Sequence, residues 1–240
     1  KAFWPGPLTM IMDKKESVSD LISGGHATVG VRIPHHPVAL NLLKDFDLGL
    51  IGPSANRFGQ ISPTTPEHVL RGLQDSIQGG IDGGRCEVGI ESTVIYLQDN
   101  QLQILRQGMV SADMIQAVLP SVPLVHDKTK VASPGTHKKH YAPHTKMQMI
   151  ASQDLEAALK AYQAQGKKVV GFGTSNLSYA HWTKMPENPE SYAKHLYEVL
   201  HRLDSEQATL ILCEHPPEGG LWGAILDRLE RACFGSHNQS

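Results

Sequence analysis

The stretch TVGVRIPHHPVALNLL, residues 28–43, contains a short strand pattern followed directly by a helical one. Val29 and Val31 alternate with small or polar neighbours, which predicts a strand over Thr28–Ile33. Pro37 suits the first turn of a helix, and apolar residues recur after it near helical spacing. A strand followed at once by an amphipathic helix is typical of layered α/β sheets.

The same alternation continues on both sides of this stretch. The first half of the chain is expected to contain, in order, a strand at Leu8–Met12, a helix at Ser17–Ile22, a strand at Gly49–Ile51, a helix from near Pro66, a hairpin of Thr93–Leu97 with Leu102–Arg106, and a helix from Ser111 to Leu119. The hairpin turn, Gln98-Asp99-Asn100-Gln101, contains residues that tolerate turn geometry.

A second α/β rhythm begins at Met147, after a segment without periodicity. Residues 120–146 hold four prolines and many basic side chains and histidines, which indicates a linker. Beyond it, the pattern predicts a helix capped by Ser152, a strand at Val169–Phe172, a helix from Pro189, a strand at Thr209–Cys213 and a helix at Leu221–Ala232. We therefore expect a domain at 1–119, an interdomain linker at 120–146 and a smaller α/β domain at 147–240.

Composition excludes several classes of protein. The 240 residues are 40% hydrophobic and 19% charged, as in ordinary globular chains, and no apolar run is long enough for a membrane helix. The net charge of −2 provides no field to hold a polyanion, so direct nucleic-acid binding is expected to be weak or absent. The three cysteines show neither a disulfide nor a zinc pattern, which favours a reducing cytoplasm.

Small polar clusters occur at the expected strand ends, where open α/β sheets bind ligands. They are Pro5-Gly6-Pro7-Leu8-Thr9, Val31-Arg32-Ile33-Pro34, Pro53-Ser54-Ala55-Asn56 and Gly89-Ile90-Glu91-Ser92-Thr93. Each of them alone is also explained by a turn that enters a helix or strand. Complete phosphate-loop and dinucleotide fingerprints are absent from the sequence.

Taken in order, these clusters resemble the YrdC-like family in its two-domain, threonylcarbamoyl-AMP synthase form. Ile81-Asp82-Gly83-Gly84, Leu105-Arg106-Gln107-Gly108 and, in the linker, Ser133-Pro134-Gly135 with His140-Tyr141-Ala142-Pro143 extend the resemblance to essentially the whole chain. The implied fold is a YrdC-like twisted open sheet with flanking helices, incomplete at its N-terminus, plus a smaller Rossmann-like α/β domain.

The resemblance implies an enzyme that makes threonylcarbamoyl-AMP and pyrophosphate from L-threonine, bicarbonate and ATP, for the modification of tRNA. Mg2+ is expected to accompany ATP, held by phosphates and water. For the C-terminal domain, docking of partner proteins of the modification pathway and positioning of the linker both stay open. No side chain is assigned as a nucleophile, because such a reaction requires mainly alignment and positive charge.

The resemblance also implies which residues form the site. Arg32 would bind the threonine carboxylate in bidentate geometry, Gly52 would let the backbone approach threonine, and Ser92 would bind its hydroxyl. The residues implied in ATP binding are Thr28, Ser54, Ser62, Arg106 and Tyr141. Helix capping, surface ion pairing and interdomain packing are the competing roles for these side chains.

The sequence departs from the family at its beginning, because family members carry a preceding segment with a threonine-containing strand and a Lys-x-Arg element. We therefore expect an N-terminally shortened chain with impaired activity. Two alternatives stay open: a non-catalytic RNA-binding or regulatory module, and carbamoyl transfer to another acceptor. A zinc site at His137, His140 and His144 is disfavoured, since no fourth ligand is evident.

Overall fold

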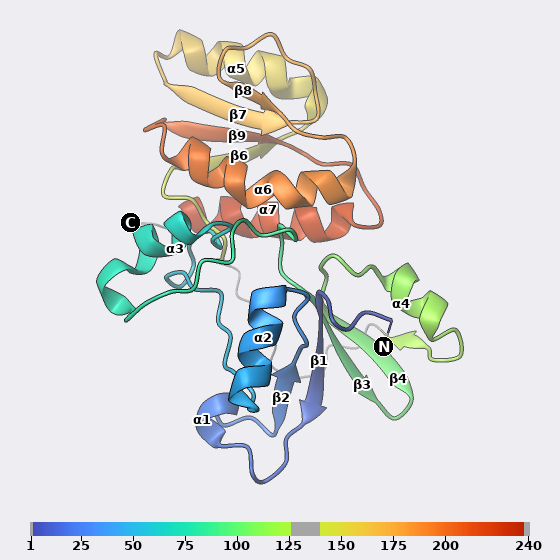
Figure 1. Ribbon diagram of the computed structural model, residues 1–240. Helices are drawn as coiled ribbons and strands as arrows, with labels where there is room; N and C mark the ends of the chain where they lie inside the picture. The colour runs from blue at the N-terminus through green and yellow to red at the C-terminus, as the bar shows by residue number, and fades with distance from the viewer. Residues whose placement is uncertain (1, 126–139, 238–240) are drawn as a thin grey trace. The chain divides into compact units, whose positions relative to one another are not determined.

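The computed structural model describes residues 2–125 and 140–237 (Figure 1). The chain divides into two compact units, of which Lys1–Pro53 with Glu91–Thr136 form the first and Ser54–Ile90 with His137–Ser240 form the second. Each unit contains its own β-sheet. The expected α/β fold with two sheets is thereby confirmed.

The first unit is built on a twisted mixed sheet with the strand order β2-β1-β3-β4-β5. Its strands are β1 (Leu8–Asp13), β2 (Thr28–Val31), β3 (Thr93–Gln98), β4 (Gln101–Arg106) and β5 (Leu124–Val125). Its helices are α1 (Asp20–Ser23), α2 (Pro37–Phe46) and α4 (Ala112–Val118). The predicted hairpin is confirmed, and Asp99 and Asn100 both adopt positive φ in its two-residue turn, as a primed turn requires.

The core of the first unit lies under β1, β3 and β4. The larger cluster contains Leu8, Ile95, Leu102, Val110, Ile115 and Val122, with Phe3 and Trp4 packed against them. A smaller cluster of Ile11, Val94 and Tyr96 lies on the opposite face of the sheet. Helices α1 and α2, by contrast, contain no buried residue. The described apolar core of this unit is therefore small.

The second unit contains a parallel sheet with the order β6-β9-β7-β8. Its strands are β6 (Met147–Ile150), β7 (Val169–Gly173), β8 (Trp182–Lys184) and β9 (Leu210–Glu214). Its helices are α3 (Pro66–Leu73), α5 (Leu155–Ala164), α6 (Pro189–Asp204) and α7 (Trp222–His237), and short 3-10 turns occur at Gln74–Ser76 and Ser152–Asp154. Figure 1 shows α5 on one side of this sheet and α6 and α7 on the other.

The predicted capping of α5 by Ser152 is wrong. Ser152 opens the 3-10 turn before the helix, and its hydroxyl bonds instead to the carboxylate of Glu214 at the end of β9. Burial opposes ionisation of Glu214, but hydrogen bonds from Ser175, Ser152 and Thr174 hold its pKa below the usual value. The buried carboxylate of Glu214 thus binds the loops that follow β6 and β7, and the Ser152 hydroxyl is not available to cap α5.

Residues 54–90 belong to the second unit because they pack against its C-terminal portion. The carbonyl of Ser62 accepts a hydrogen bond from His201 Nε2 at 3.1 Å, the amide of Ala142 donates to the Gly59 carbonyl at 2.9 Å, and Arg85 forms an ion pair with Glu198. The expected domain limits, which place one domain at 1–119, a linker at 120–146 and a second domain at 147–240, stay a prediction. Most of the expected linker lies outside the described residues.

The expected strand at Gly49–Ile51 is wrong, because this segment has no regular structure. Its backbone pairs with none of the described strands, and Ile51 is 72% exposed. The strands β5, β6 and β8 were not expected from the sequence. None of the helices within residues 2–125 and 140–237 is both long and apolar enough to cross a lipid bilayer.

Candidate functional site

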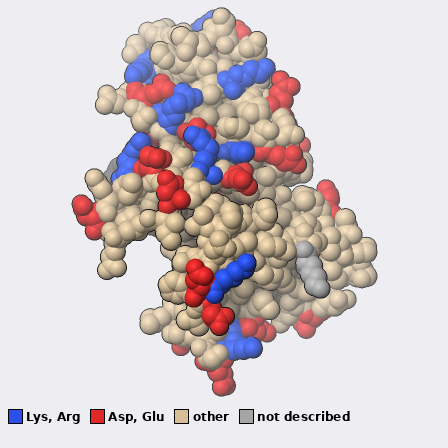
Figure 2. Space-filling model, viewed as in Figure 1, with Lys and Arg blue, Asp and Glu red and all other residues tan. Residues whose placement is uncertain are grey.

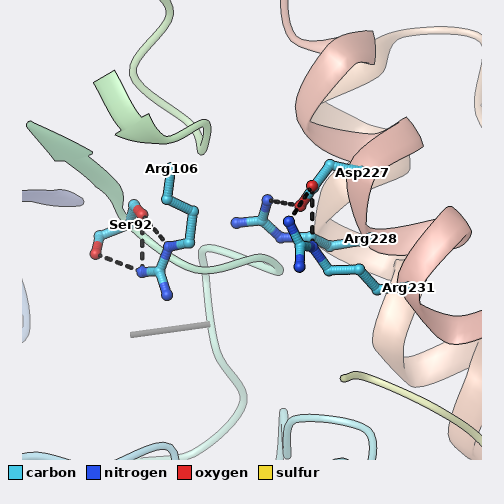
Figure 3. Close-up of polar contacts among 5 residues, drawn as sticks. All are labelled: Ser92, Arg106, Asp227, Arg228 and Arg231. Atoms are coloured by element: carbon cyan, nitrogen blue, oxygen red, sulfur yellow. Dashed lines mark hydrogen bonds and ion pairs between the residues drawn. The ribbon is translucent and has the colours of Figure 1, made fainter. Parts of the chain in front are cut away.

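Three polar side chains, of Thr9, Ser92 and Arg106, meet at one end of the sheet of the first unit. Figure 3 shows the contact between Ser92 and Arg106. The hydroxyl groups of Thr9 and Ser92 lie 2.7 Å apart. Arg106 donates from Nε and Nη2 to the Ser92 carbonyl at 3.1 and 2.9 Å, and from Nη2 to the Ser92 hydroxyl at 3.2 Å. Arg106 is therefore fixed by three hydrogen bonds to a single buried serine.

Strand register explains why residues distant in sequence meet here. Strand β1 runs parallel to β3, with Leu8 opposite Thr93, so Thr9 and Ser92 both lie where these strands begin. Strand β4 runs antiparallel to β3 and ends at Arg106, opposite Val94. The sheet thus gathers hydroxyls and a guanidinium at one end.

Arg32 reaches the same end of the sheet. It directly follows β2, which is antiparallel to β1 and pairs Val31 with Met10. Partial desolvation, together with the positive charge of Arg106, lowers the pKa of Arg32, although its side chain keeps contact with solvent. The positive charges of Arg32 and Arg106 therefore repel each other, and an anion bound near both would relieve this repulsion.

The loop after Arg106 is held down by Thr93 and Gly108. The Thr93 hydroxyl donates to the Val110 carbonyl at 2.7 Å and accepts from the Val110 amide at 3.0 Å. A Cβ on Gly108 would lie 2.4 Å from the Glu91 carbonyl oxygen and 2.4 Å from the Thr93 nitrogen. Only glycine fits this close approach, which keeps the loop against Ser92.

Thr28 and Gly52 are the other two predicted site residues in the first unit. Thr28 begins β2 and pairs with Asp13, at the opposite end of the strand from Arg32. Gly52 lies in the irregular segment that precedes Pro53, where a Cβ would meet no atom within 4 Å. The sheet does not bring either residue into the Thr9–Ser92–Arg106 cluster, and their roles stay predictions.

Ser54 and Ser62 belong to the second unit. Ser54 is exposed, and Ser62 is buried. Between them, the Asn56 amide donates to the carbonyls of Arg57 and Gln60 at 2.8 and 3.2 Å, so Asn56 shapes this loop. The two serines are thereby held on an ordered loop that precedes α3.

Tyr141 also belongs to the second unit, and it is enclosed rather than open. Its side chain is 1% exposed and stacks on Tyr197 with a centroid separation of 5.6 Å. The Arg228 guanidinium lies over the same ring, 5.5 Å from its centroid. The ring is thus packed within the second unit, and its contact with ATP stays a prediction.

Sequence reasoning did not single out Thr9 as a functional side chain. Thr9 stands at the end of the Pro5–Thr9 cluster, but its partner Ser92 lies 83 positions away and is reached only through the β1–β3 pairing. The linker residues Ser133–Gly135 and the histidine at 137 lie outside the described residues.

The donor set of the site does not suit a metal cage. Thr9, Ser92, Arg32 and Arg106 supply hydroxyls and guanidinium groups, whereas Mg2+ prefers carboxylate, carbonyl and water oxygens. Within the part of the chain that the structure describes, three His, Cys, Asp or Glu side chains do not come together to hold a metal ion. Any magnesium ion here would have to be held mainly by its nucleotide.

Two family models match the chain. Residues 1–108 match the Sua5/YciO/YrdC model, described as "Telomere recombination". Residues 110–233 match the model described as "Threonylcarbamoyl-AMP synthase, C-terminal domain". Together they span nearly the whole sequence.

Curated relatives agree with these models. Threonylcarbamoyl-AMP synthase from Pyrococcus abyssi is 33% identical over 243 residues, which cover 97% of this chain and 72% of the relative. The enzyme of that name from Bacillus subtilis is 33% identical over 248 residues, with 98% and 72% covered.

Solved structures are similar as well. The crystal structure of P. abyssi Sua5 with L-threonine has a TM-score of 0.88 and 31% identity, and the match covers 98% of this chain and 72% of that chain. A variant of the same protein with a histidine and a tyrosine replaced by alanine gives a TM-score of 0.86 at 30% identity, with 98% and 71% covered.

Proposed function

Since the chain belongs to the threonylcarbamoyl-AMP synthase family, we propose that it makes L-threonylcarbamoyl-AMP and pyrophosphate from L-threonine, bicarbonate and ATP. The reaction is a nucleotidyl transfer, and its product would supply the threonylcarbamoyl group for N6-threonylcarbamoyladenosine in tRNA. The observation that carries the proposal is the convergence of Arg32 and Arg106 beside the hydroxyls of Thr9 and Ser92.

Each of these groups suits one part of the substrates. The exposed Arg32 can grip the threonine carboxylate with two parallel hydrogen bonds, and Ser92 can bind the threonine hydroxyl. Arg106, already fixed to Ser92, would place positive charge beside the phosphates. Gly52 would contribute main-chain contact to threonine, and Thr28, Ser54, Ser62 and Tyr141 would contact ATP.

The chemistry requires no nucleophilic side chain. The threonine amine first adds to the carbon of bicarbonate with loss of water, which gives a carbamate. A carbamate oxygen then attacks the α-phosphorus, the new P–O bond forms, and the bond to the β-phosphate oxygen breaks to release pyrophosphate. The protein aligns the reactants and stabilises the developing negative charge.

Magnesium would bind to the protein only together with ATP. When bound to the phosphates it would screen their charge, and its ligands would be mainly phosphate oxygens and water. The side chains described above bind and orient the substrates without it.

The competing functions gain less support. The named relatives are synthases, and one of them was crystallised with L-threonine, which favours an amino-acid substrate over another acceptor. Figure 2 shows basic and acidic side chains intermixed on the visible face, which agrees with the net charge of −2 and does not suggest an extended RNA-binding surface. Contacts with proteins of tRNA modification stay part of the proposal.

Titration calorimetry with L-threonine and with ATP and magnesium tests the function, together with release of pyrophosphate that depends on bicarbonate. Arg32→Ala should weaken threonine binding by roughly 10- to 100-fold, because it removes a charge-assisted contact of about 1.5–3 kcal/mol. Arg202→Gln removes an exposed arginine that pairs with Glu206 and should bind threonine like the wild type. Absence of binding of both ligands, or normal threonine binding by Arg32→Ala, would contradict the proposal.

A further inference from the structure

Tyr141 has an unusual backbone conformation for a buried aromatic residue. Its φ is +60°, in the left-handed region that bulky residues rarely adopt. Such conformations persist only where the surrounding structure determines them, and they concentrate at functional positions. The contacts that the second unit makes with Tyr141 therefore determine the backbone conformation at this position.

The Tyr141 ring is enclosed by side chains of two helices. Tyr197 of α6 stacks on it with the two ring planes 29° apart, and Arg228 of α7 lies over the ring. The Arg228 side chain is 0% exposed and donates from Nη1 to Asp227 at 2.9 Å. Asp227 also accepts two hydrogen bonds from Arg231, at 2.7 and 2.9 Å (Figure 3).

The backbone around Tyr141 is fastened on both sides. The Ala142 amide donates to the Gly59 carbonyl at 2.9 Å, in an isolated parallel bridge between Gln60 and Ala142. The amides of His144 and Thr145 donate to the carboxylate of Asp204 at 3.1 and 2.7 Å. The segment is thus attached to the loop before α3 and to the end of α6.

From these contacts we infer that Arg228 is a positioning residue, which holds Tyr141 and with it the His140–Pro143 segment against α6 and α7. Burial of a guanidinium is costly unless its charge is compensated, and an apolar side chain could fill the same space without that cost. A desolvated cation over an aromatic face gains strength and orients the ring, which an apolar side chain cannot do. Helices α6 and α7 of the second unit therefore position this segment.

The consequence for ATP rests on the proposed function, in which Tyr141 contacts ATP. If the segment must be held in one conformation to meet the nucleotide, loss of Arg228 should weaken ATP binding without removing any group that touches it.

Amide hydrogen exchange of the full chain without substrates tests the inference directly. Arg228→Met keeps the volume and removes the charge, and it should speed exchange at the Ala142, His144 and Thr145 amides by roughly tenfold. Arg228→Lys, which keeps the charge, should restore part of the protection. The Gly171 amide, which donates to the His181 carbonyl at 3.0 Å in the sheet, reports global opening and should not change.

Two further variants separate the ring from its hydroxyl. Tyr141→Phe keeps the aromatic face and should keep the protection, whereas Tyr141→Leu should lose it. The inference is overturned if Arg228→Met leaves these amides protected, or if exchange at Gly171 rises by the same factor.

Kinetics add an independent readout. Arg228→Met should raise the KM for ATP several-fold and change kcat less, and Arg202→Gln should change neither. If the wild-type chain binds neither L-threonine nor ATP, the proposed function fails, and hydrogen exchange still decides whether Arg228 holds the segment.

Discussion

The positive charges of Arg32 and Arg106 repel each other, which favours an anion near both side chains. Arg106 cannot turn away without losing three hydrogen bonds to Ser92. Arg32 remains exposed, yet partial desolvation and the charge of Arg106 lower its pKa. Because Arg106 is already fixed by its hydrogen bonds, it would lose little side-chain freedom when an anion binds.

Replacement of Thr9 tests whether the hydroxyl pair belongs to the threonine site. Thr9→Val has nearly the same shape and removes the group that lies 2.7 Å from the Ser92 hydroxyl. Because a neutral hydrogen bond contributes about 0.5–1.5 kcal/mol, threonine affinity measured by calorimetry should fall roughly 3- to 10-fold. Thr209→Val, at an exposed threonine of the second unit, is the matched control. Equal affinities of the two variants would remove Thr9 from the site.

Replacement of Gly108 tests the close approach of the loop behind Arg106. A Cβ at this position would lie 2.4 Å from main-chain atoms of Glu91 and Thr93, so the backbone must shift. Gly108→Ala should lower the free energy of unfolding by about 1–3 kcal/mol, as measured by urea denaturation. Gly80→Ala, where a Cβ meets no atom within 4 Å, should change it by less than about 0.5 kcal/mol. A stable Gly108→Ala variant would show that the loop has room.

Helices α3 and α6 meet through a pair of stacked histidines. The rings of His68 and His201 lie 3.8 Å apart, and the Ser62 carbonyl accepts a hydrogen bond from His201. Burial lowers the pKa of His201 to about 4, and the adjacent His68 contributes to this. Burial also lowers the pKa of His68. The packing of these two elements therefore depends on both rings being neutral.

The unfolded chain binds more protons than the folded chain between pH 6.5 and about 4, because the folded pKa of His201 is depressed. The contribution of this pair to stability should be complete above pH 6.5 and should decrease as the pH falls toward 4, by about 1–2 kcal/mol after allowance for partial exposure. Thermal melts between pH 7.5 and 4.5 measure this slope. His201→Gln can still donate to Ser62 but does not titrate, so its slope should be shallower. An identical slope would show that other groups cause the acid sensitivity.

Local signals in the sequence predicted most elements, and non-local pairing explains the remainder. The β3–β4 hairpin follows from alternation around Asp99-Asn100, and α6 follows from Pro189 and the apolar period after it. By contrast, Leu50 and Ile51 are apolar but find no described strand to pair with, so their segment remains irregular. The short strand β8 pairs in parallel with β7, and periodicity cannot detect three residues.

The candidate site shows the same limit. Motif resemblance located Arg32, Ser92 and Arg106, and the sheet register places them at one end. Thr9 joins them only because β1 pairs with β3, which lies more than 80 residues away in the sequence. Resemblance likewise could not show that Tyr141 is enclosed by helices that follow it by many residues.

At the scale of the whole molecule, the two units differ in how much core they bury. In the second unit, β7 and β9 are buried at every position, and α6 contributes seven buried residues. In the first unit, the described core consists of two smaller clusters on opposite faces of the sheet, and neither α1 nor α2 buries a residue. Since burial of apolar surface is the main stabilising contribution, the first unit should be the less stable of the two.

Calorimetric unfolding should therefore show two transitions, because units with separate cores need not unfold together. Arg32, Ser92 and Arg106 all belong to the first unit, so L-threonine should stabilise the lower transition. At a concentration of about 100 times Kd this linkage amounts to about 2.7 kcal/mol. For a unit of roughly 100 residues the lower Tm should rise on the order of 10 °C. Gly108→Ala should lower the same transition, and the upper one should respond to neither change. If threonine raises the upper transition, or if a single transition persists in the Gly108→Ala variant, the assignment of substrate binding and lower stability to the first unit is wrong.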